Sequence, residues 1–187
     1  KDVHIDNPEL VADKYPFELS GGMRQRIVIA LAMAAPPNLL IADEPTTALD
    51  VTIQYEIINL IKELNKKRGT SVLFISHDLG VISNTCERIM VMYAGEVVES
   101  GKTKKVLTHP RHPYTKSLLK ALPDSAAPDE PLQAIDGEAP NLLQRPVGCA
   151  FSDRCSQVMD VCKRDHPKLL ESGPGHHVSC WLEKVTV

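Results

Sequence analysis

Residues 39–45 read LLIADEP, a short continuous apolar run that ends in two adjacent carboxylates and a proline. Such a run is the pattern of a strand that is buried on both faces of a parallel sheet. Open α/β sheets bind ligands at the carboxyl ends of their strands. We therefore expect Asp43 and Glu44 to lie at a ligand-binding edge and to point in different directions, because successive strand residues alternate. A solvated acidic turn that caps a helix is the plain alternative for an isolated pair.

The segments around this run alternate between helical and strand patterns. We expect helices over residues 22–35 and 52–67 and strands over residues 71–75, 88–93 and 96–100. The first helix is expected to end at Pro36-Pro37, and the last two strands to form a hairpin through Ala94-Gly95. This alternation predicts an α/β fold with a parallel-sheet core and helices.

The composition is that of an ordinary soluble globular protein. The 187 residues are 43% hydrophobic and 24% charged, which suits one well-cored domain with an appendage. A net charge of −3 and 4% aromatic residues argue against nucleic acid as a partner. The longest uncharged run, residues 27–42, is interrupted by prolines and is too short for a bilayer span, and we expect neither a membrane span nor a signal peptide.

Two further polar features point to an anionic ligand. Ser20-Gly21-Gly22 opens the first predicted helix, where unpaired backbone N–H groups and the positive helix end attract anions. A plain serine N-cap is the commoner explanation of that tripeptide. His77 follows the strand 71–75. Because parallel strands end at the same edge, His77 and Glu44 are placed to converge on one ligand, although a helix-capping histidine is the simpler reading of His77 alone.

These features occur in the order and spacing of the ATP-binding-cassette (ABC) ATPases, and residues 15–101 resemble that P-loop family closely. The matching motifs are the signature motif at 19–25, Walker B at 40–44, the D-loop at 48–50 and the switch histidine at 77. Four motifs that agree in one chain are far more specific than any one of them. The resemblance implies the C-terminal part of an ABC-type ATPase domain.

The resemblance also implies roles in ATP hydrolysis for three residues. Asp43 would hold Mg²⁺ through its water shell, and Glu44 would be the general base for the hydrolytic water. His77 would contact the γ-phosphate. Glu44 and His77 are the catalytic residues that the family pattern implies.

Other motif positions are implied to contact nucleotide across a dimer. Ser20, Gly21 and Gly22, within the signature motif that Gln25 closes, would contact ATP bound by the opposite subunit of a head-to-tail dimer. Asp50 would couple the two sites across the interface. Both expectations come from the family and not from the spacing itself.

The family's Walker A loop is not found in residues 1–18. The segment Gly95–Thr103 ends in Gly-Lys-Thr but has one residue too many, follows Walker B and ends a hairpin, so we assign it no phosphate role. Walker A supplies the lysine-bearing backbone cradle for the β- and γ-phosphates. We therefore expect the chain to be a C-terminal fragment that neither binds nor hydrolyses ATP well by itself.

Residues 102–187 are expected to form a separate extension after an ATPase part at 1–101. Two short helices are predicted on either side of residues 109–113, and the proline-rich stretch after residue 122 is not expected to form long elements. His112-Pro113-Tyr114-Thr115, with residues 135–141 and 148–155, is similar to the extension of peptide and nickel importer ATPases.

That similarity implies an ATP-binding subunit that powers the import of di- or oligopeptides. It would act with a second, different ABC subunit and two membrane-spanning permease subunits, peripherally at the cytoplasmic face of the inner membrane. A soluble ABC ATPase without a permease, and a metal-bearing interaction or regulatory module, remain as alternatives. The substrate stays open, because peptide, nickel chelate and oligosaccharide are all compatible with this chain.

Four cysteines in the extension form a candidate metal site. Cys149, Cys155, Cys162 and Cys180 are spaced Cys-x5-Cys-x6-Cys-x17-Cys. Structural zinc usually takes two close cysteine pairs, which are absent here. The wider steps favour a [4Fe–4S] cluster over zinc, with disulfides third, and a cluster occurs in some members of the resembled family. We expect such a group to hold a tail that has few apolar residues to bury.

Overall fold

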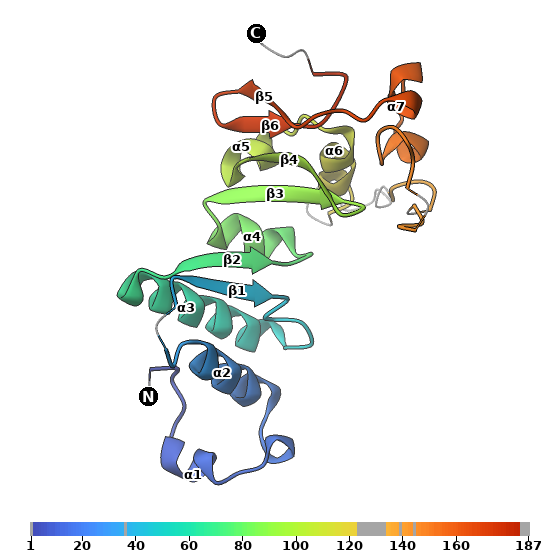
Figure 1. The fold of residues 1–187 in the computed structure, drawn as a ribbon. Helices are drawn as coiled ribbons and strands as arrows, with labels where there is room; N and C mark the ends of the chain where they lie inside the picture. Colours follow the sequence, from blue (N-terminus) through green and yellow to red (C-terminus); the bar gives the residue numbers. More distant parts are fainter. Residues whose placement is uncertain (1, 36, 123–133, 139, 144, 184–187) are drawn as a thin grey trace, which may run out of the picture. The chain divides into compact units, whose positions relative to one another are not determined.

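The computed structural model describes residues 2–35, 37–122, 134–138, 140–143 and 145–183 (Figure 1). Pro36, Ala139 and the stretch 123–133 lie outside the described residues. The helix expected over 22–35 ends earlier than Pro36-Pro37, at Ala32, so that expected end is wrong. The chain forms two compact units, residues 1–85 and 86–187. Each unit is described by itself.

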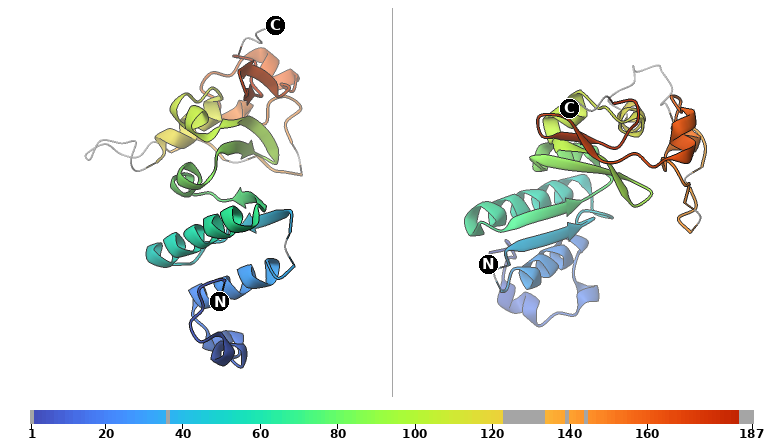
Figure 2. Two further views of the ribbon diagram at one scale, coloured as in Figure 1. Left: turned by 90° about the vertical axis from the view of Figure 1, so that its left-hand side faces the viewer. Right: turned by 45° about the horizontal axis from the view of Figure 1, so that its top comes forward.

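Unit 1 contains one parallel strand pair and the helices that surround it. Its elements are α1 Pro8–Ala12, a 3-10 turn Pro16–Glu18, α2 Gly21–Ala32, β1 Leu39–Asp43, α3 Val51–Arg68, β2 Ser71–Ile75 and α4 Leu79–Thr85. β1 pairs with β2 in parallel, with Asp43 opposite Ile75. Helix α3 runs along the strand pair, and α2 packs against α3 (Figures 1 and 2). The predicted α/β class is confirmed.

Helix α3 forms the core of unit 1. Its most deeply buried residues recur at helical spacing, and they are Ile57, Leu60, Ile61 and Leu64. Asp50 caps the first turn by accepting a hydrogen bond from the Ile53 N–H at 3.0 Å. Gly69 ends the helix in the left-handed conformation, with φ of 66°, which glycine adopts without steric cost. The helix predicted over 52–67 is therefore confirmed.

The strand pair is buried on one face only, and the expectation of burial on both faces is wrong. Ala42 and Phe74 are buried, whereas Ile41 and Ile75 on the opposite face are 60% and 43% exposed. Side chains alternate between the two faces of a strand. Among the described residues of unit 1, no layer covers the second face. A continuous apolar run indicates that both faces of a strand can be buried. Whether both are buried depends on whether other elements pack against each face.

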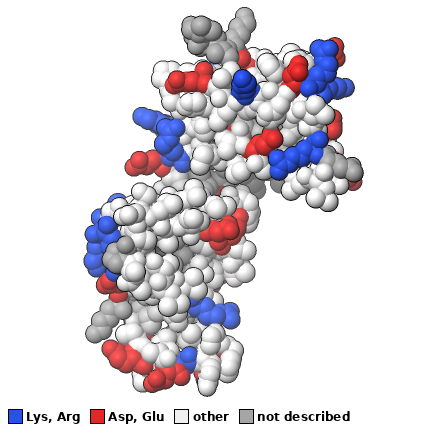
Figure 3. Space-filling model, viewed as in Figure 1, with Lys and Arg blue, Asp and Glu red and all other residues white. Residues whose placement is uncertain are grey.

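Unit 2 is built on a four-stranded antiparallel sheet in the order β3-β4-β6-β5. Its elements are β3 Arg88–Tyr93, β4 Glu96–Lys102, α5 Thr103–Thr108, α6 Pro113–Lys120, a 3-10 turn Ser152–Arg154, α7 Asp160–Arg164, β5 Leu170–Gly173 and β6 His176–Val178. The hairpin through Ala94-Gly95 is confirmed, and so are the two short helices around residues 109–113. Acidic and basic side chains are interspersed on the face seen in Figure 3.

The compact units differ from the expected division at residue 101. Strand β4 pairs with β6 from the tail, with Ser100 opposite His177. The hairpin that we assigned to the ATPase part is therefore continuous with the extension in one sheet. Sequence motifs show where the resemblance to a family ends. The boundary of a compact unit depends instead on which strands pair, and here β4 pairs with β6. The division into 1–101 and 102–187 stays a prediction about the family pattern.

The tail is held by an aromatic cluster and not by long elements. In the described part of residues 134–183, no helix or strand is longer than five residues. Phe151 is 2% exposed, and its ring centroid lies 5.1 Å from that of Tyr93 and 5.4 Å from that of Tyr114. Arg154 donates hydrogen bonds to the carbonyls of Ile135 and Asp136, each at 2.8 Å. These contacts fix the loops of the tail on the sheet and on α6.

We expect Phe151→Ala to destabilise unit 2 by about 3–5 kcal/mol, because the lost aromatic contacts leave a cavity. Denaturant unfolding followed through the fluorescence of Trp181, the single tryptophan of the chain, measures this loss. Leu143→Ala is the control, since Leu143 is 93% exposed and its truncation leaves no cavity. Equal unfolding midpoints for the two variants would contradict a cluster that anchors the tail.

Candidate functional site

Glu44 and His77 meet at the carboxyl edge of the strand pair. The Glu44 N–H donates to the carbonyl of Ile75 at 3.0 Å, which extends the pairing of β1 with β2 by one residue. The N–H of His77 donates to Oε1 of Glu44 at 3.0 Å, and its ring Nδ1 donates to the same oxygen at 2.9 Å. The two residues thus meet at one edge, as the parallel strands predicted, and their convergence on a ligand stays a prediction.

Thr47 is a third member of this group that the sequence reading missed. Its hydroxyl donates to Oε2 of Glu44 at 2.8 Å, and its N–H donates to the Glu44 carbonyl at 3.2 Å. The sequence did carry a signal for this contact, because Thr47 follows Glu44 by three residues in a turn, where a hydroxyl can reach the carboxylate. Glu44 itself has a φ of 44°, a conformation that costs a non-glycine residue free energy and that clusters at functional sites.

The hydrogen bonds keep the Glu44 carboxylate ionised. The His77 side chain, followed by the Thr47 hydroxyl, lowers the pKa of Glu44. In turn, the hydrogen bond and the charge of Glu44 raise the pKa of His77. The His77 side chain is 81% exposed, so solvent screens this pair. Oε1 of Glu44 accepts two hydrogen bonds and Oε2 accepts one, so Oε2 keeps a lone pair that can accept a proton from a water.

The other predicted site residues of unit 1 lie apart from this pair or carry structural roles. Asp43 is exposed as the last residue of β1. Ser20 caps α2 and accepts from the Met23 N–H at 3.3 Å, and Gln25 lies half-buried on the same helix. Asp50 caps α3. Among the described residues, no hydrogen bond or ion pair joins the segment 20–25 to Glu44 or His77.

The two glycines after Ser20 are required at least in part for packing. A Cβ atom at Gly22 would lie 2.8 Å from Cγ2 of Ile53 on α3, and one at Gly21 would lie 3.2 Å from Cδ2 of Leu49. Close approach of α2 to the residues around Asp50 thus accounts for glycine at both positions. The sequence reading offered anion binding or a plain serine cap and missed this third reason.

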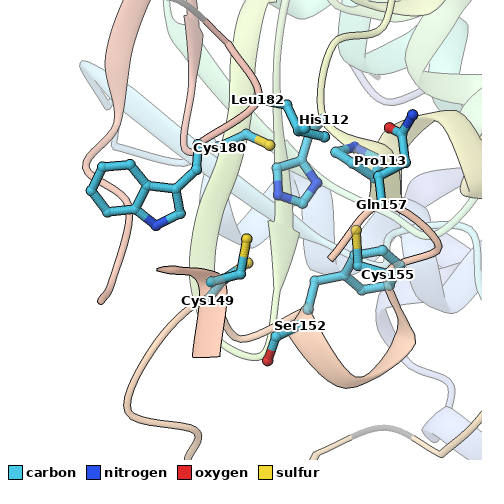
Figure 4. Close-up of a pocket in the computed structure, with 11 residues that line it drawn as sticks. His112, Pro113, Cys149, Ser152, Cys155, Gln157, Cys180 and Leu182 are labelled. Carbon is cyan, nitrogen blue, oxygen red and sulfur yellow. The ribbon is translucent and has the colours of Figure 1, made fainter. Parts of the chain in front are cut away.

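The four cysteines of the tail line one cavity in unit 2, which we call the cysteine cavity (Figure 4). The Cys149 N–H donates to the carbonyl of Cys162 at 2.7 Å. Gly148 permits this approach, because a Cβ there would lie 2.1 Å from the same carbonyl oxygen. Burial raises the pKa of Cys149 to about 11, and it also raises the pKa of Cys155 and Cys180.

A metal-binding arrangement is not confirmed for these cysteines. The thiols of Cys149, Cys155, Cys162 and Cys180 are free. Within the described residues, no group of three or more His, Cys, Asp or Glu side chains is arranged to hold a metal ion. Neutral thiols do not bind metals, so a resident group would have to bind with release of their protons.

His112, from the turn before α6, lines the cysteine cavity as well. It is 1% exposed, and burial lowers its pKa to about 4. Its Nδ1 accepts from the Tyr114 N–H at 3.0 Å, whereas its buried Nε2 has no hydrogen-bond partner. The Ser179 carbonyl raises the His112 pKa to a smaller extent, but it does not lie in hydrogen-bonding geometry with Nε2.

We expect Glu44→Gln to lower the pKa of His77 toward its ordinary value, because the neutral amide no longer favours the imidazolium. NMR titration of the His77 ring measures the shift. Since the pKa of His77 is raised and that of Glu44 is lowered in the folded chain, the pairing is strongest in the pH window where His77 is protonated and Glu44 is ionised, and it weakens as the pH rises through the pKa of His77. Glu63→Gln, the same change made on helix α3 and away from this edge, should leave the titration of His77 unaltered.

Comparison with known proteins identifies both parts of the chain. The model of the family "ABC transporter" matches residues 2–47. The model of the family "Oligopeptide/dipeptide transporter, C-terminal region" matches residues 98–162. In the part of the chain that the structure describes, no helix is both long and apolar enough for a transmembrane segment.

Curated relatives match nearly every residue. The chain is 50% identical over 188 residues to the probable D,D-dipeptide transport ATP-binding protein DdpD of Escherichia coli, which covers 100% of this chain and 57% of that protein. It is 49% identical to a probable peptide ABC transporter ATP-binding protein of Sinorhizobium fredii, over 99% of this chain and 56% of that protein. It is also 49% identical to the oligopeptide transport ATP-binding protein OppD of Bacillus subtilis, over 96% of this chain and 51% of that protein.

The chain thus spans about half the length of the curated relatives it matches. The matches run through both compact units, since one family model falls in unit 1 and the other in unit 2. On these similarities, the chain belongs to the family of ATP-binding proteins of peptide ABC transporters.

Proposed function

We propose that residues 1–187 are part of an ATP-hydrolysing subunit that powers the import of di- or oligopeptides through an ABC transporter. The observation that carries the proposal is the Glu44–His77 pair at the carboxyl edge of β1 and β2. An ionised carboxylate and a histidine at one sheet edge suit a hydrolytic water and a phosphate. The matched relatives, which are named as peptide transport proteins, support the substrate class.

In this proposal three residues act directly on the nucleotide. Glu44 is the general base, because its carboxylate is held ionised and oriented by His77 and Thr47. His77 contacts the γ-phosphate through its exposed ring. Asp43 holds Mg²⁺ through water, which its exposed position at the end of β1 permits. Mg²⁺ prefers carboxylate and water ligands of this kind.

The remaining motif residues belong to a dimer interface in this proposal. Ser20, Gly21, Gly22 and Gln25 at the start of α2 contact ATP held by a second ABC ATPase subunit, arranged head to tail, and Asp50 lies between the two sites. Ser20, at the N-terminus of α2, is exposed and so accessible to an anionic ligand. The assembly includes two membrane-spanning permease subunits, with this subunit peripheral at the cytoplasmic face of the inner membrane.

We expect Glu44→Gln in the whole protein, assembled with its partner subunits, to lower ATP turnover at least about a hundredfold, as loss of a general base does. ATP binding should persist, because the amide keeps the shape of the side chain and the base acts on water in the transition state. Phosphate release and equilibrium nucleotide binding measure the two effects separately.

Glu63→Gln is the matched control for turnover, since Glu63 lies on the exposed side of α3 and pairs with His4. Turnover of the Glu44→Gln protein close to that of the wild type would remove Glu44 from the role of base. Loss of ATP binding together with turnover would instead indicate that Glu44 supports the ground-state complex.

We further propose that Cys149, Cys155, Cys162 and Cys180 hold a [4Fe–4S] cluster with a structural or redox-sensing role, with zinc as the alternative. The donor set fits, because all four thiols line one cavity and a cluster takes one cysteine for each iron. A cluster is larger than one ion, so its ligands need not gather around a single point. The buried Nε2 of His112 in the same cavity is also consistent with a missing occupant.

We expect anaerobically purified whole protein to be brown and to contain about four irons per chain. Cys155→Ser should lose most of this iron, because one ligand is removed, whereas Cys86→Ser should retain it, because Cys86 does not line the cavity. Iron and zinc analysis of the three proteins measures the outcome. A colourless wild-type protein with one zinc per chain would overturn the cluster while keeping the four-cysteine site.

A further inference from the structure

We propose that His112 is a positioning residue that donates a hydrogen bond from Nε2 to one sulfur atom of the metal group in the cysteine cavity, and that Glu99 fixes His112 in place. This inference rests on the four-cysteine site proposed above. It concerns this chain's own residues and assigns a role to the first residue of the His112-Pro113-Tyr114 segment.

The backbone of the turn decides which ring nitrogen of His112 carries the proton. The Tyr114 N–H donates to Nδ1 at 3.0 Å, so Nδ1 must present a lone pair. The proton of the neutral imidazole therefore lies on Nε2, which is a donor. This assignment follows from the hydrogen bond alone.

The Nε2 donor is buried without a partner. His112 is among the most deeply buried side chains of the described residues. The Ser179 backbone acts on the ring, but no acceptor within the described residues lies in hydrogen-bonding geometry with Nε2. A buried unmade hydrogen bond is destabilising and calls for an explanation such as an absent ligand. Figure 4 shows the ring among the sulfur atoms of Cys149, Cys155 and Cys180. The missing acceptor is thus expected inside the cysteine cavity.

Sulfur becomes a good acceptor when it carries negative charge. A neutral thiol is only a weak hydrogen-bond acceptor. Thiolates bound to iron, and the sulfides between irons, carry the charge that a neutral N–H donor favours. Hydrogen bonds to these sulfurs raise the reduction potential, because they stabilise the more negative reduced state. His112 is placed to supply one such bond.

Glu99 on β4 holds the turn that presents His112. Its Oε1 accepts from the Arg111 N–H at 2.8 Å, and its Oε2 accepts from the His112 N–H at 3.0 Å. Nε2 of His176 on β6 donates to Oε1 at 2.6 Å. Glu99 and His176 are both completely buried. A buried carboxylate is tolerated only when it is well paired. Glu99 therefore needs these three donors, and the turn at residues 111–112 needs Glu99 to accept its two backbone N–H groups.

Two variants of the whole, iron-loaded protein separate the donor from the rest of the side chain. In His112→Asn the side-chain oxygen replaces Nδ1 and can still accept from the Tyr114 N–H, but no donor reaches the cavity. In His112→Gln the amide N–H₂ lies near the position of Nε2 and restores the donor. The measurements are iron per chain and the midpoint potential, from an anaerobic dithionite titration followed by electron paramagnetic resonance.

We expect the His112→Asn protein to keep its iron and to favour the oxidised state about tenfold more than the wild type. For a one-electron couple this corresponds to a potential about 59 mV more negative. The His112→Gln protein should stay close to the wild-type potential. Selective loss of iron from His112→Asn, with iron retained in His112→Gln, would equally support the donor role.

Other results overturn the inference. If both variants keep their iron and the wild-type potential, the Nε2 donor does not contact the metal group, while the four-cysteine site stands. If both variants lose iron to the same extent, His112 acts only in packing. If the wild-type protein itself contains no iron, the cluster proposed above fails and the role of His112 fails with it.

Discussion

The parallel pairing of β1 with β2 is the constraint on which the candidate active site depends. Because Asp43 lies opposite Ile75 in this register, the residues that follow each strand emerge at one edge. One more backbone hydrogen bond, from Glu44 to Ile75, carries the pairing into the turn and leaves the Glu44 side chain within reach of His77. A register shift of one residue would reverse the faces of one strand and separate the pair.

Unit 2 is stabilised in a different way, because its tail has only short helices and strands. Its stability comes from a few deeply buried groups that each fasten several loops. Phe151 packs against the rings of Tyr93 and Tyr114, and Glu99 binds the backbone of residues 111–112 together with His176. The cysteine cavity lies within this set of contacts, so an occupant of the cavity would contribute to folding as well as to any redox function.

The two units also differ in how completely their apolar surface is covered. In unit 1 the strand pair has an exposed face that includes Ile41 and Ile75, and two strands alone are marginally stable without packing against helices. In unit 2 the sheet has four strands and the aromatic cluster beside it. The helical packing of α3 is therefore the principal stabilising contribution in unit 1, through side chains such as Ile57 and Leu60.

Local patterns in the sequence were sufficient for α3, for the strands β1 to β4 and for the central pair of the site, but not for the short tail strands β5 and β6. The helical spacing of Ile57, Leu60, Ile61 and Leu64 predicted α3, and the apolar runs predicted β1 and β2, because each signal depends only on residues close in the chain. The pairing of Glu44 with His77 was predictable as well, because parallel strands necessarily end at the same edge.

Only the tertiary structure decided how these elements are covered and which buried groups meet. Three features depend on residues that are not neighbours in the chain. They are the exposed face of β1 and β2, the packing of Gly22 against Ile53, and the contact of Glu99 with the turn at His112. A glutamate in a strand has no local pattern that distinguishes a buried acceptor of three hydrogen bonds from a solvated charge. Burial is a property of the neighbours that folding brings together, and the residues adjacent in sequence do not specify them.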